Sequence, residues 1–499
     1  MRVSVISVVG VHAVLAGAAS PVDNGFGDGL RNCLLAAVGG NIALVAFQGE
    51  PFYQAVAVKA YNLNIPITPA AVTFPKSSDQ VAAVVKCAAE RGYKVQSKCG
   101  GHSYGNYGLG GTDGEIVVDL KNMKQTSMDD ATFHATFGGG VLLSDVDKYL
   151  HSSNGRAISH GTCPQVGLGG HATIGGLGPT SRQFGMALDH ILEVEVVLAN
   201  SSIIRASETQ NRDLLFAIKG AAAGFGIVTE FTVRTEKEET MAVQYSYTFA
   251  FGNTSTRANL FKKWQSFISD SRLTRKFASI FTILPGSVVI SGTFFGTKAE
   301  YDSLGFEDKF PGYANSNVVV FRDWLGLVGS WSEDLILDLG GGVPTSFYSR
   351  SLSFNEERLI PNATIDDLFH YVDTNSQGSL LWFVIFDLAG GATNDIPSDA
   401  TAYVHRDVLF WMQSYATSVG PVSKTTYGFL DGINELLTKP YPGVDFGAYP
   451  GYVDPRLTDA QKAYWGSNLA RLEKTKSEID PNDVFHNPQS VQPESGQRS

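Results

Sequence analysis

Apolar and polar positions along the first half of the chain alternate between helical and strand spacings. Apolar residues from Val81 to Ala88 recur at intervals of three and four, which predicts a helix capped by Ser77 or Ser78 and ended by Gly92. Strand patterns lie on both sides of this helix, and the second one runs directly into a glycine-rich loop. The first part of the chain is therefore expected to contain an α/β unit.

The same spacings predict a hairpin over 191–207 that turns at Asn200, a helix over 213–220 and a strand after it. From about Glu236 the chain becomes richer in aromatic residues and lacks glycine loops, which indicates a second domain. Seven consecutive apolar residues, Leu380–Phe386, predict a strand buried on both faces that ends at Asp387.

A further helix is expected over 460–476. The length of 499 residues exceeds one ordinary core and agrees with two domains.

A net charge of −11, without any basic run, argues against a nucleic acid partner.

Residues 1–20 contain Arg2, an apolar segment and then small residues before Pro21, which is the arrangement of a secretory signal peptide. A membrane anchor is the competing interpretation, although the apolar segment is short for a span and no later stretch is long enough to cross a bilayer. Three sequons, at Asn200, Asn253 and Asn362, suit an exported glycoprotein. We expect a secreted protein without a membrane segment.

Export makes disulfides possible among the four cysteines. These residues are Cys33, Cys87, Cys99 and Cys163. They allow three complete pairings, or one disulfide with two thiols left for other chemistry, and we expect one disulfide.

Two glycine-rich loops, 97–111 and 159–185, carry the candidate chemistry. Glycine at this density is typical of backbone that turns sharply or lies directly against a ligand. Each loop also contains one nucleophilic side chain, His102 in the first and Cys163 in the second. The two loops are therefore expected to hold one cofactor between them.

Two other kinds of site compete with this interpretation. The spacing of Gly167, Gly169 and Ala172 matches a dinucleotide fingerprint, but the following ATIGGLGPTS cannot continue as the helix that such a site requires. No P-loop pattern is present in the sequence. Zinc has four candidate ligands, namely Cys99, His102, Cys163 and His171. The plainest alternative to any ligand site is that His102 is a hydrogen-bonded histidine in a turn and Cys163 a free buried thiol.

The sequence resembles the berberine bridge enzyme-like flavoproteins. The resemblance rests on SKCGGHSYGNYGLGG, SHGTCPQVGLGGHATIGGLGPTSRQFG, FAIKGAAAGFGIVTEF, AYPGYVD and DPNDVFHNPQSV, and it spans nearly all of the chain after the signal. It implies the α+β, two-domain fold of vanillyl-alcohol oxidase, and it is greatest for the fungal branch that contains glucooligosaccharide oxidases, chitooligosaccharide oxidases and FAD-linked oxidases of secondary metabolism. The expected domains are an FAD-binding domain over 21–235, with its PCMH-type core at about 67–237, a substrate domain over 236–440, and a segment over 441–499 that returns to the first domain.

The resemblance also implies how FAD is held. His102 would bond to the 8α-methyl group of the flavin and Cys163 to its C6, because an imidazole and a thiolate can add to an electron-poor ring. The other expected cofactor contacts are Gly100, Gly101, Ser103, Gly167, Gly169, Gly170, His171, Gly226 and Ile227. The family disulfide falls on Cys33 and Cys87. Cys99 departs from the Ser or Gly that relatives commonly have there.

By the same resemblance Tyr452 is the catalytic base and Asp387 its partner. The ordinary pKa of tyrosine is about 10, so Asp387 is expected to accept the Tyr452 hydrogen bond and relay the proton. Each residue also has a purely structural interpretation. Asp387 would cap a helix or a turn, and Tyr452 would pack in the core. The expected substrate contacts are Tyr104, Gln413, Phe383, Ile385 and Tyr449. Phe383 and Ile385 stand where glucooligosaccharide oxidase has Trp and Gln, which makes the pocket less polar.

These inferences describe a secreted, monomeric, FAD-linked oxidase that transfers a hydride from an alcohol carbon to the flavin and is reoxidised by O2 to give H2O2. Its substrate is either a carbohydrate oligomer, which would give a lactone, or an aromatic or polyketide metabolite, and the sequence balances the two. The alternatives are a flavin- or ligand-binding protein without turnover and a zinc-dependent hydrolase.

Overall fold

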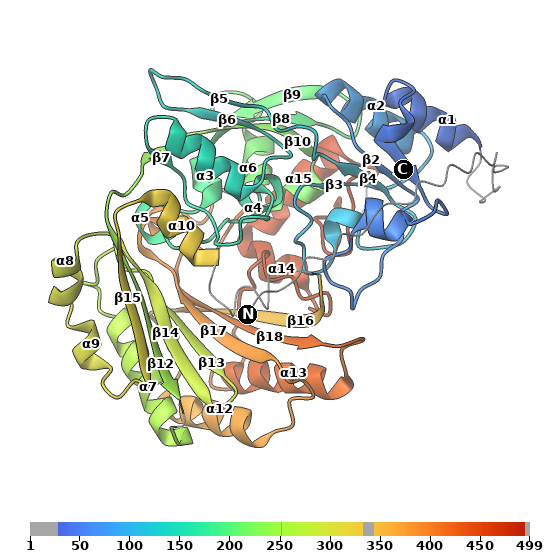
Figure 1. The fold of residues 1–499 in the computed structure, drawn as a ribbon. Coiled ribbons are helices and arrows are strands. Elements are labelled where there is room, and N and C mark those ends of the chain that lie inside the picture. The colour runs from blue at the N-terminus through green and yellow to red at the C-terminus, as the bar shows by residue number, and fades with distance from the viewer. Residues whose placement is uncertain (1–27, 251, 333–343, 495–499) are drawn as a thin grey trace, which may run out of the picture.

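The computed structural model describes residues 28–250, 252–332 and 344–494. The expected signal peptide, residues 1–20, lies outside the described residues. Two smaller sheets form the upper half of Figure 1, and one large sheet with its helices forms the lower half.

The first sheet has the strand order β1-β2-β4-β3, in which β2, β4 and β3 are parallel and β1 is antiparallel. Its strands are β1 (Val45–Phe47), β2 (Ala71–Thr73), β3 (Val95–Lys98) and β4 (Ile116–Asp119). The expected helix is α2 (Ser78–Ala89), and the Oγ of Ser77 accepts from the backbone N–H of Gln80 at 3.3 Å. The α/β unit read from the sequence is confirmed, with Ser77 as the cap.

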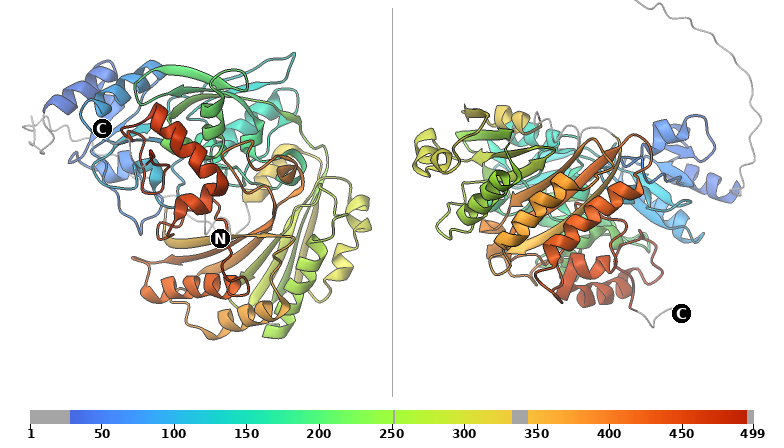
Figure 2. Two further views of the ribbon diagram at one scale, coloured as in Figure 1. Left: turned by 180° about the vertical axis from the view of Figure 1, so that it is seen from behind. Right: turned by 90° about the horizontal axis from the view of Figure 1, so that it is seen from below.

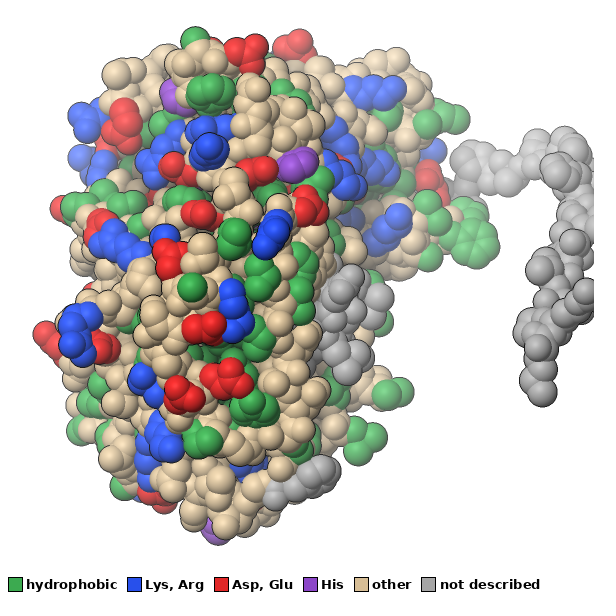
Figure 3. All heavy atoms as spheres, turned by 60° about the vertical axis from the view of Figure 1, so that its left-hand side comes forward, with side chains coloured by type: hydrophobic (Ala, Val, Ile, Leu, Met, Phe, Trp, Pro, Cys, Tyr) green, Lys and Arg blue, Asp and Glu red, His purple; other side chains and the backbone are tan. Residues whose placement is uncertain are grey.

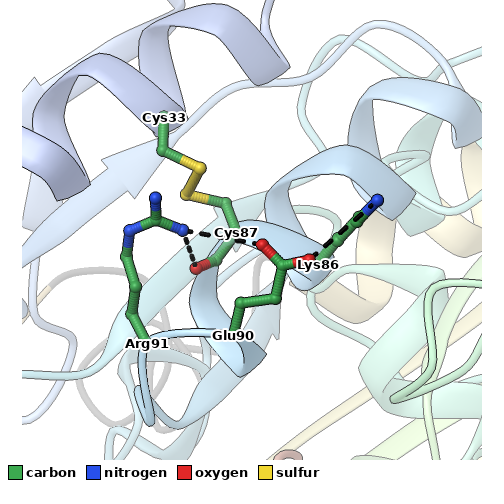
Figure 4. The surroundings of a disulfide bond; sticks show 5 residues. All are labelled: Cys33, Lys86, Cys87, Glu90 and Arg91. Carbon is green, nitrogen blue, oxygen red and sulfur yellow. Dashed lines mark hydrogen bonds and ion pairs between the residues drawn. A yellow bond between two sulfur atoms is a disulfide. The ribbon is translucent and has the colours of Figure 1, made fainter.

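A disulfide joins α1 (Asp28–Ala37) to α2. The bond links Cys33 and Cys87, as the resemblance implied. Figure 4 shows Arg91 beside it, where the guanidinium donates to the carbonyl oxygen of Cys87 at 3.1 Å and pairs with Glu90. The disulfide therefore closes the amino-terminal helix onto the α/β unit.

The second sheet is antiparallel, with the order β5-β6-β10-β8-β9. Its strands are β5 (Thr126–Met128), β6 (Ala135–Gly138), β8 (Ile191–Val197), β9 (Ile203–Ser207) and β10 (Ile227–Val233). The helices in this part are α3 (Leu143–Ser152), α4 (Leu168–Ala172), α5 (Ser181–Phe184) and α6 (Arg212–Ala221). Strands β8 and β9 form the expected hairpin around Asn200. A short ribbon of β7 (Arg156–Ala157) and β11 (Glu236–Lys237) follows.

The large sheet has seven strands in the order β15-β12-β14-β13-β17-β18-β16. These strands are β12 (Ala242–Ala250), β13 (Ile280–Leu284), β14 (Ser287–Phe294), β15 (Asn315–Phe321), β16 (Ser346–Asn355), β17 (Trp382–Leu388) and β18 (Val408–Ser418). The accompanying helices are α7 (Thr254–Ile268), α8 (Lys298–Ser303), α9 (Phe306–Lys309), α10 (Trp324–Ser332), α12 (Asn362–Thr374) and α13 (Lys424–Thr438).

Helices α7, α12 and α13 cover one face of this sheet (Figures 1 and 2). Strand β17 contains most of the run predicted over Leu380–Phe386, but it begins at Trp382 and continues past Asp387 to Leu388, and Leu380 is fully exposed. The two faces of the strand pack differently. Val384 and Phe386 belong to the core beneath the helices, whereas Phe383 and Ile385 belong to a separate cluster on the opposite face. Since side chains alternate along a strand, Asp387 lies on the same face as Phe383 and Ile385.

The chain then returns to the first part, as the left view of Figure 2 shows. The single helix expected over 460–476 is wrong, because the structure has α14 (Ala460–Trp465) and α15 (Leu469–Ile479). Gly466 ends α14 with a φ of +47°, a conformation that glycine adopts at little cost. The indole N–H of Trp465 donates to the carbonyl of Gly220 at 3.0 Å, and the ammonium of Lys476 to that of Gly224 at 2.7 Å.

On the face drawn in Figure 3, acidic and basic side chains are interspersed rather than gathered by sign. The three sequon asparagines, Asn200, Asn253 and Asn362, are all exposed. Among the described residues, no helix combines the length and apolar character that a membrane span would need.

Candidate active site

A cavity of about 480 Å³ lies where the two glycine loops, the large sheet and the returning segment meet. The first loop follows β3, and the second leads from β7 into α4. Tyr452 comes from the returning segment, and Asp387 from the cavity face of β17. Segments far apart in the sequence therefore share one wall.

The two glycine loops touch each other as well as the cavity. A Cβ atom on Gly100 would lie 2.4 Å from the backbone nitrogen of Gly167, and a Cβ on Gly167 would lie 2.4 Å from the Sγ of Cys99. A side chain at either position would therefore displace the backbone. Part of the glycine content thus serves contact between the loops, whereas the sequence predicted sharp turns or ligand contact.

His102 lies in the cavity wall with its ring stacked on Tyr61, at a centroid distance of 4.6 Å. Burial lowers the pKa of His102 to about 4, so the imidazole is neutral at neutral pH. Cys163 lines the same cavity. Burial raises the pKa of Tyr104 to about 12, and the nearby Cys163 contributes to that rise. The two predicted nucleophiles are thus brought to one cavity.

Tyr452 lies against Tyr104, with centroids 6.1 Å apart and planes 28° from parallel. Burial raises the pKa of Asp387 to about 7. Burial also raises the pKa of Tyr452 well above its ordinary value, and the negative charge of Asp387 adds to this. The phenol of Tyr452 is therefore protonated at neutral pH, and no hydrogen bond joins it to Asp387 within the described residues.

Tyr449 precedes Tyr452 in the same turn and also lines the cavity. Its hydroxyl oxygen accepts from the backbone N–H groups of Gly176 and Leu177, at 3.0 and 3.1 Å. These bonds attach the returning segment to the second glycine loop. Tyr449 was predicted as a substrate contact, and its hydroxyl already has two protein partners.

Gln413 lies on β18 opposite Ile385 of β17, and both residues line the cavity. The amide nitrogen of Gln413 donates to the hydroxyl oxygens of Tyr104 and Ser349, at 3.3 and 3.2 Å. Phe383, in contrast, is not among the lining residues. It stacks on Tyr415 at 4.9 Å, so it supports the wall from behind.

The other predicted cofactor residues also divide into those that line the cavity and one that does not. Gly100, Gly101, Ser103, Gly167, Gly169, Gly170, His171 and Gly226 line the cavity. Ile227 does not, since it packs in the core of the first sheet.

Cys99 lines the cavity, and burial raises its thiol pKa to about 12. No group of three or more His, Cys, Asp or Glu side chains that could hold a metal ion occurs in the described part of the chain.

Sequence reasoning missed three aromatic residues at this wall. Tyr61 lines the cavity beside His102, and Phe347 and Tyr415 stack behind it with rings 4.8 Å apart. None of them lies in a motif. Tyr61 is brought here by Asn106, whose side-chain oxygen accepts from the backbone N–H groups of Tyr61 and Asn62, both at 3.1 Å. Only the fold relates these residues.

Two family profiles match the chain: one described as FAD binding domain, over residues 69–207, and one described as berberine and berberine like, over 448–492. An FAD-linked oxidoreductase, sorD, of Penicillium rubens is 42% identical over 92% of this chain and 98% of its own length. Xylooligosaccharide oxidase of Thermothelomyces thermophilus is 34% identical over 87% of this chain and 89% of its own.

Solved structures agree with these relatives. A structure of glucooligosaccharide oxidase from Acremonium strictum, described as having a 6-S-cysteinyl, 8α-N1-histidyl FAD, is 31% identical and superposes with a TM-score of 0.84, covering 93% of this chain and 99% of that one. The fold is therefore that of the vanillyl-alcohol oxidase type, and the protein is an FAD-dependent oxidoreductase. Within that class, the chain belongs to the berberine bridge enzyme-like family.

The residues at the cavity fit FAD. The backbone N–H groups of Gly101, His102 and Ser103 have no acceptor among the described residues, and successive free N–H groups of this kind hold the oxygens of a pyrophosphate. A Cβ on Gly170 would meet no atom within 4 Å, so this glycine leaves open space beside them. These N–H groups and the open space at Gly170 could therefore hold the phosphates of FAD.

Proposed function

We propose that this protein is a secreted oxidase in which FAD is bound covalently through both His102 and Cys163. It takes a hydride from a hydroxyl-bearing carbon of its substrate, and O2 is the final acceptor and becomes H2O2. The observation that supports this best is that His102, Cys163, Tyr452 and Asp387, from four separate segments, line one cavity.

The environment of His102 suits attachment. His102 is neutral at neutral pH, so a ring nitrogen is available for bonding. Its stacking on Tyr61 limits rotation of the imidazole. The structure of glucooligosaccharide oxidase carries the same pair of linkages. The flavin, when bound, supplies the electron-poor ring that accepts a hydride.

The chain's own part in the reaction is to move the proton of the substrate hydroxyl. Tyr452 is protonated, so it can accept this proton only as its own proton leaves. The proposed acceptor is Asp387, whose charge acts on Tyr452 although no hydrogen bond joins the two among the described residues. The carboxyl of Asp387 has a pKa of about 7, which suits an acceptor that must gain and lose a proton in each turnover. Tyr104, held by the amide of Gln413, bounds the space in which the substrate hydroxyl is oriented.

We infer that the substrate is an alcohol of an aromatic or polyketide metabolite. Ile280 and Ile385 contribute apolar surface to the wall, where a sugar would need hydrogen-bonding groups for its hydroxyls. A carbohydrate oligomer is the second candidate, supported by relatives named as oligosaccharide oxidases. The proposed division is an FAD-binding part over 21–235 and 441–499 and a substrate part over 236–440.

Two measurements test this proposal. Acid denaturation should leave a yellow protein pellet and a colourless supernatant, and a colourless pellet would contradict covalent attachment. An H2O2 assay over aromatic alcohols and oligosaccharides, with Tyr452→Phe as control, should then show turnover that falls by about 10² to 10⁴ in the variant. A yellow protein that no alcohol reduces without oxygen would instead be a flavin-binding protein without turnover.

Export has its own test. Residues 1–20 are proposed to direct secretion, and Asn200, Asn253 and Asn362 to carry glycans. Expression in a fungal host should place the protein in the medium with a mass that endoglycosidase lowers, and retention in the cell would contradict the proposal.

A further inference from the structure

Buried histidines hold the backbone that leads into Cys163. The N–H of Ser159 donates to Nε2 of His190 at 3.2 Å, and the N–H of Gly161 donates to Nε2 of His171 at 2.8 Å. A ring nitrogen that accepts a hydrogen bond carries no proton, so His171 and His190 are neutral. Burial lowers their pKa values to about 3 and about 4, which agrees with this assignment.

His160 differs from both neighbours, because both of its ring nitrogens face acceptors. Nδ1 lies 2.7 Å from the carbonyl oxygen of Gly161, and Nε2 lies 2.8 Å from Oδ1 of Asp147 on α3. A carbonyl cannot donate, and neither can an ionised carboxylate, so beside an ionised Asp147 the imidazole carries both protons. The charge of Asp147 raises the pKa of His160 despite its burial, which agrees with this assignment. With side chains 3% and 8% exposed, His160 and Asp147 form a buried ion pair.

The peptide groups of Gly161 are therefore held on both sides. Its N–H is bound by the neutral His171, and its carbonyl by the charged His160. A Cβ on Gly178 would lie 1.7 Å from the carbonyl oxygen of His160, so the backbone is also packed closely from that side. Thr162 and Cys163 follow directly, and both line the cavity. The turn that presents the thiol is thus set by these contacts.

A buried ion pair is a poor source of stability, since desolvation offsets much of the attraction and an apolar pair of similar volume often stabilises as well. The ion pair has a larger effect on the position of the backbone than on stability. The charged imidazole makes a stronger hydrogen bond to the Gly161 carbonyl than a neutral donor would. Because covalent bond formation requires atoms held close to the reactive geometry, a small displacement of this turn would slow it strongly.

We propose that the Asp147–His160 ion pair positions the turn that carries Cys163, so that its thiol can bond to the flavin ring. This inference rests on the covalent attachment proposed above. In that attachment the S–C bond replaces the thiol S–H and a ring C–H bond, and the two protons and two electrons pass to O2, which becomes H2O2. Asp147 and His160 are positioning residues, because neither touches the reacting atoms.

The test measures linkage rather than activity. His160→Phe removes both hydrogen bonds but leaves Asp147 buried without a partner, which destabilises the fold. The double variant Asp147→Leu with His160→Phe removes both charges and is expected to fold. His151→Gln is the matched control, because His151 lies on the same helix α3, pairs with Glu238 at 2.8 Å and does not line the cavity.

Each protein is purified with its flavin and digested, and mass spectrometry measures the share of flavin bound to the Cys163 peptide. Titration of free thiols in urea checks the result. We expect the wild type and His151→Gln to be linked through both residues. The double variant should retain the His102 bond while its Cys163-linked share falls at least tenfold. Full linkage in a folded double variant would overturn this inference alone, whereas a wild type without any Cys163 linkage would overturn the covalent attachment as well.

Discussion

Burial gives the Asp387 carboxyl a pKa of about 7, against an ordinary value of 3.8. As a proton acceptor it must be ionised, so kcat/KM is expected to fall as pH drops below about 7. Asp387→Asn should remove this dependence and lower kcat by about 10² to 10³, as for loss of a general base. A pH profile of both proteins checks this, and an unchanged profile in the variant would assign the dependence to another group.

The same raised pKa also affects stability. Activity is expected to rise with pH, whereas the contribution of Asp387 to stability is expected to fall. Between about pH 4 and 7 the folded protein binds a proton at Asp387 that the unfolded chain has released, so this carboxyl lowers stability as pH rises. At about 1.4 kcal/mol per pKa unit, the penalty is about 4 kcal/mol at pH 8. Asp387→Asn should therefore raise the free energy of unfolding at pH 8 and leave it nearly unchanged at pH 4. Equal effects at both pH values would show that the carboxyl is solvated.

Ile385 allows the substrate inference to be tested at one position. Its side chain lines the cavity opposite Gln413, so Ile385→Gln would place a second amide beside the first. Hydrogen bonds to sugar hydroxyls should raise kcat/KM for an oligosaccharide by about tenfold, while activity on an aromatic alcohol falls by a similar factor. Loss of activity on both substrates, with unchanged flavin content, would contradict this account.

At the scale of elements, the contact between the two glycine loops is sensitive to one added methyl group. Gly100→Ala would bring a Cβ to 2.4 Å from the Gly167 nitrogen, so one loop must move. We expect a loss of about 2 to 4 kcal/mol in unfolding free energy, together with reduced flavin content. Thermal unfolding and the visible spectrum measure the two effects.

Gly428 provides the matched control, because it lies exposed in helix α13 and an added Cβ would meet no atom within 4 Å. Gly428→Ala should stabilise by about 0.5 to 1 kcal/mol, the usual difference between these residues in a helix. If both variants lost flavin equally, the effect could not be attributed to the loop contact.

Elements also show where sequence patterns succeed. Helix α2 and strand β17 were predictable because each has one dominant local signal, a capped apolar stripe in the first and a long apolar run in the second. The helix expected over 460–476 was wrong because apolar spacing continues across Gly466, where the backbone turns to a positive φ. Glycine permits that conformation but does not require it, so the break depends on the contacts of Trp465 and Lys476 with the first part of the chain.

At the scale of the whole molecule, Arg406 and Asp189 join the segment between β17 and β18 to the first part of the chain. Both side chains are almost fully buried and make two hydrogen bonds, of 2.9 and 3.0 Å. Arg406→Met would leave Asp189 buried without its ion-pair partner, and we expect it to lower the unfolding free energy by about 3 to 5 kcal/mol. Denaturant titration checks this. A change below 1 kcal/mol would mean that water replaces the guanidinium.

The disulfide acts between helices α1 and α2. It closes a loop with a sequence separation of 54, which should stabilise the fold by about 4 kcal/mol through the entropy of the unfolded chain. Replacing Cys33 and Cys87 together by alanine should remove this contribution. Because Cys163 lines the cavity and neither disulfide cysteine does, the flavin linkage should persist, and its loss would show that α1 and α2 support the site.

The sequence by itself determined the local elements, the two glycine loops, and His102, Cys163 and Tyr452 as candidates, because each depends on residues near one another in the chain. Only the tertiary structure decided that Tyr61, Phe347 and Tyr415 back the cavity wall, that Phe383 lies behind it, and that His160 is paired with Asp147. Those relations depend on burial and on contacts between distant segments. A pKa or a hydrogen-bond partner is a property of such an environment, so no pattern of residues along the chain contains it.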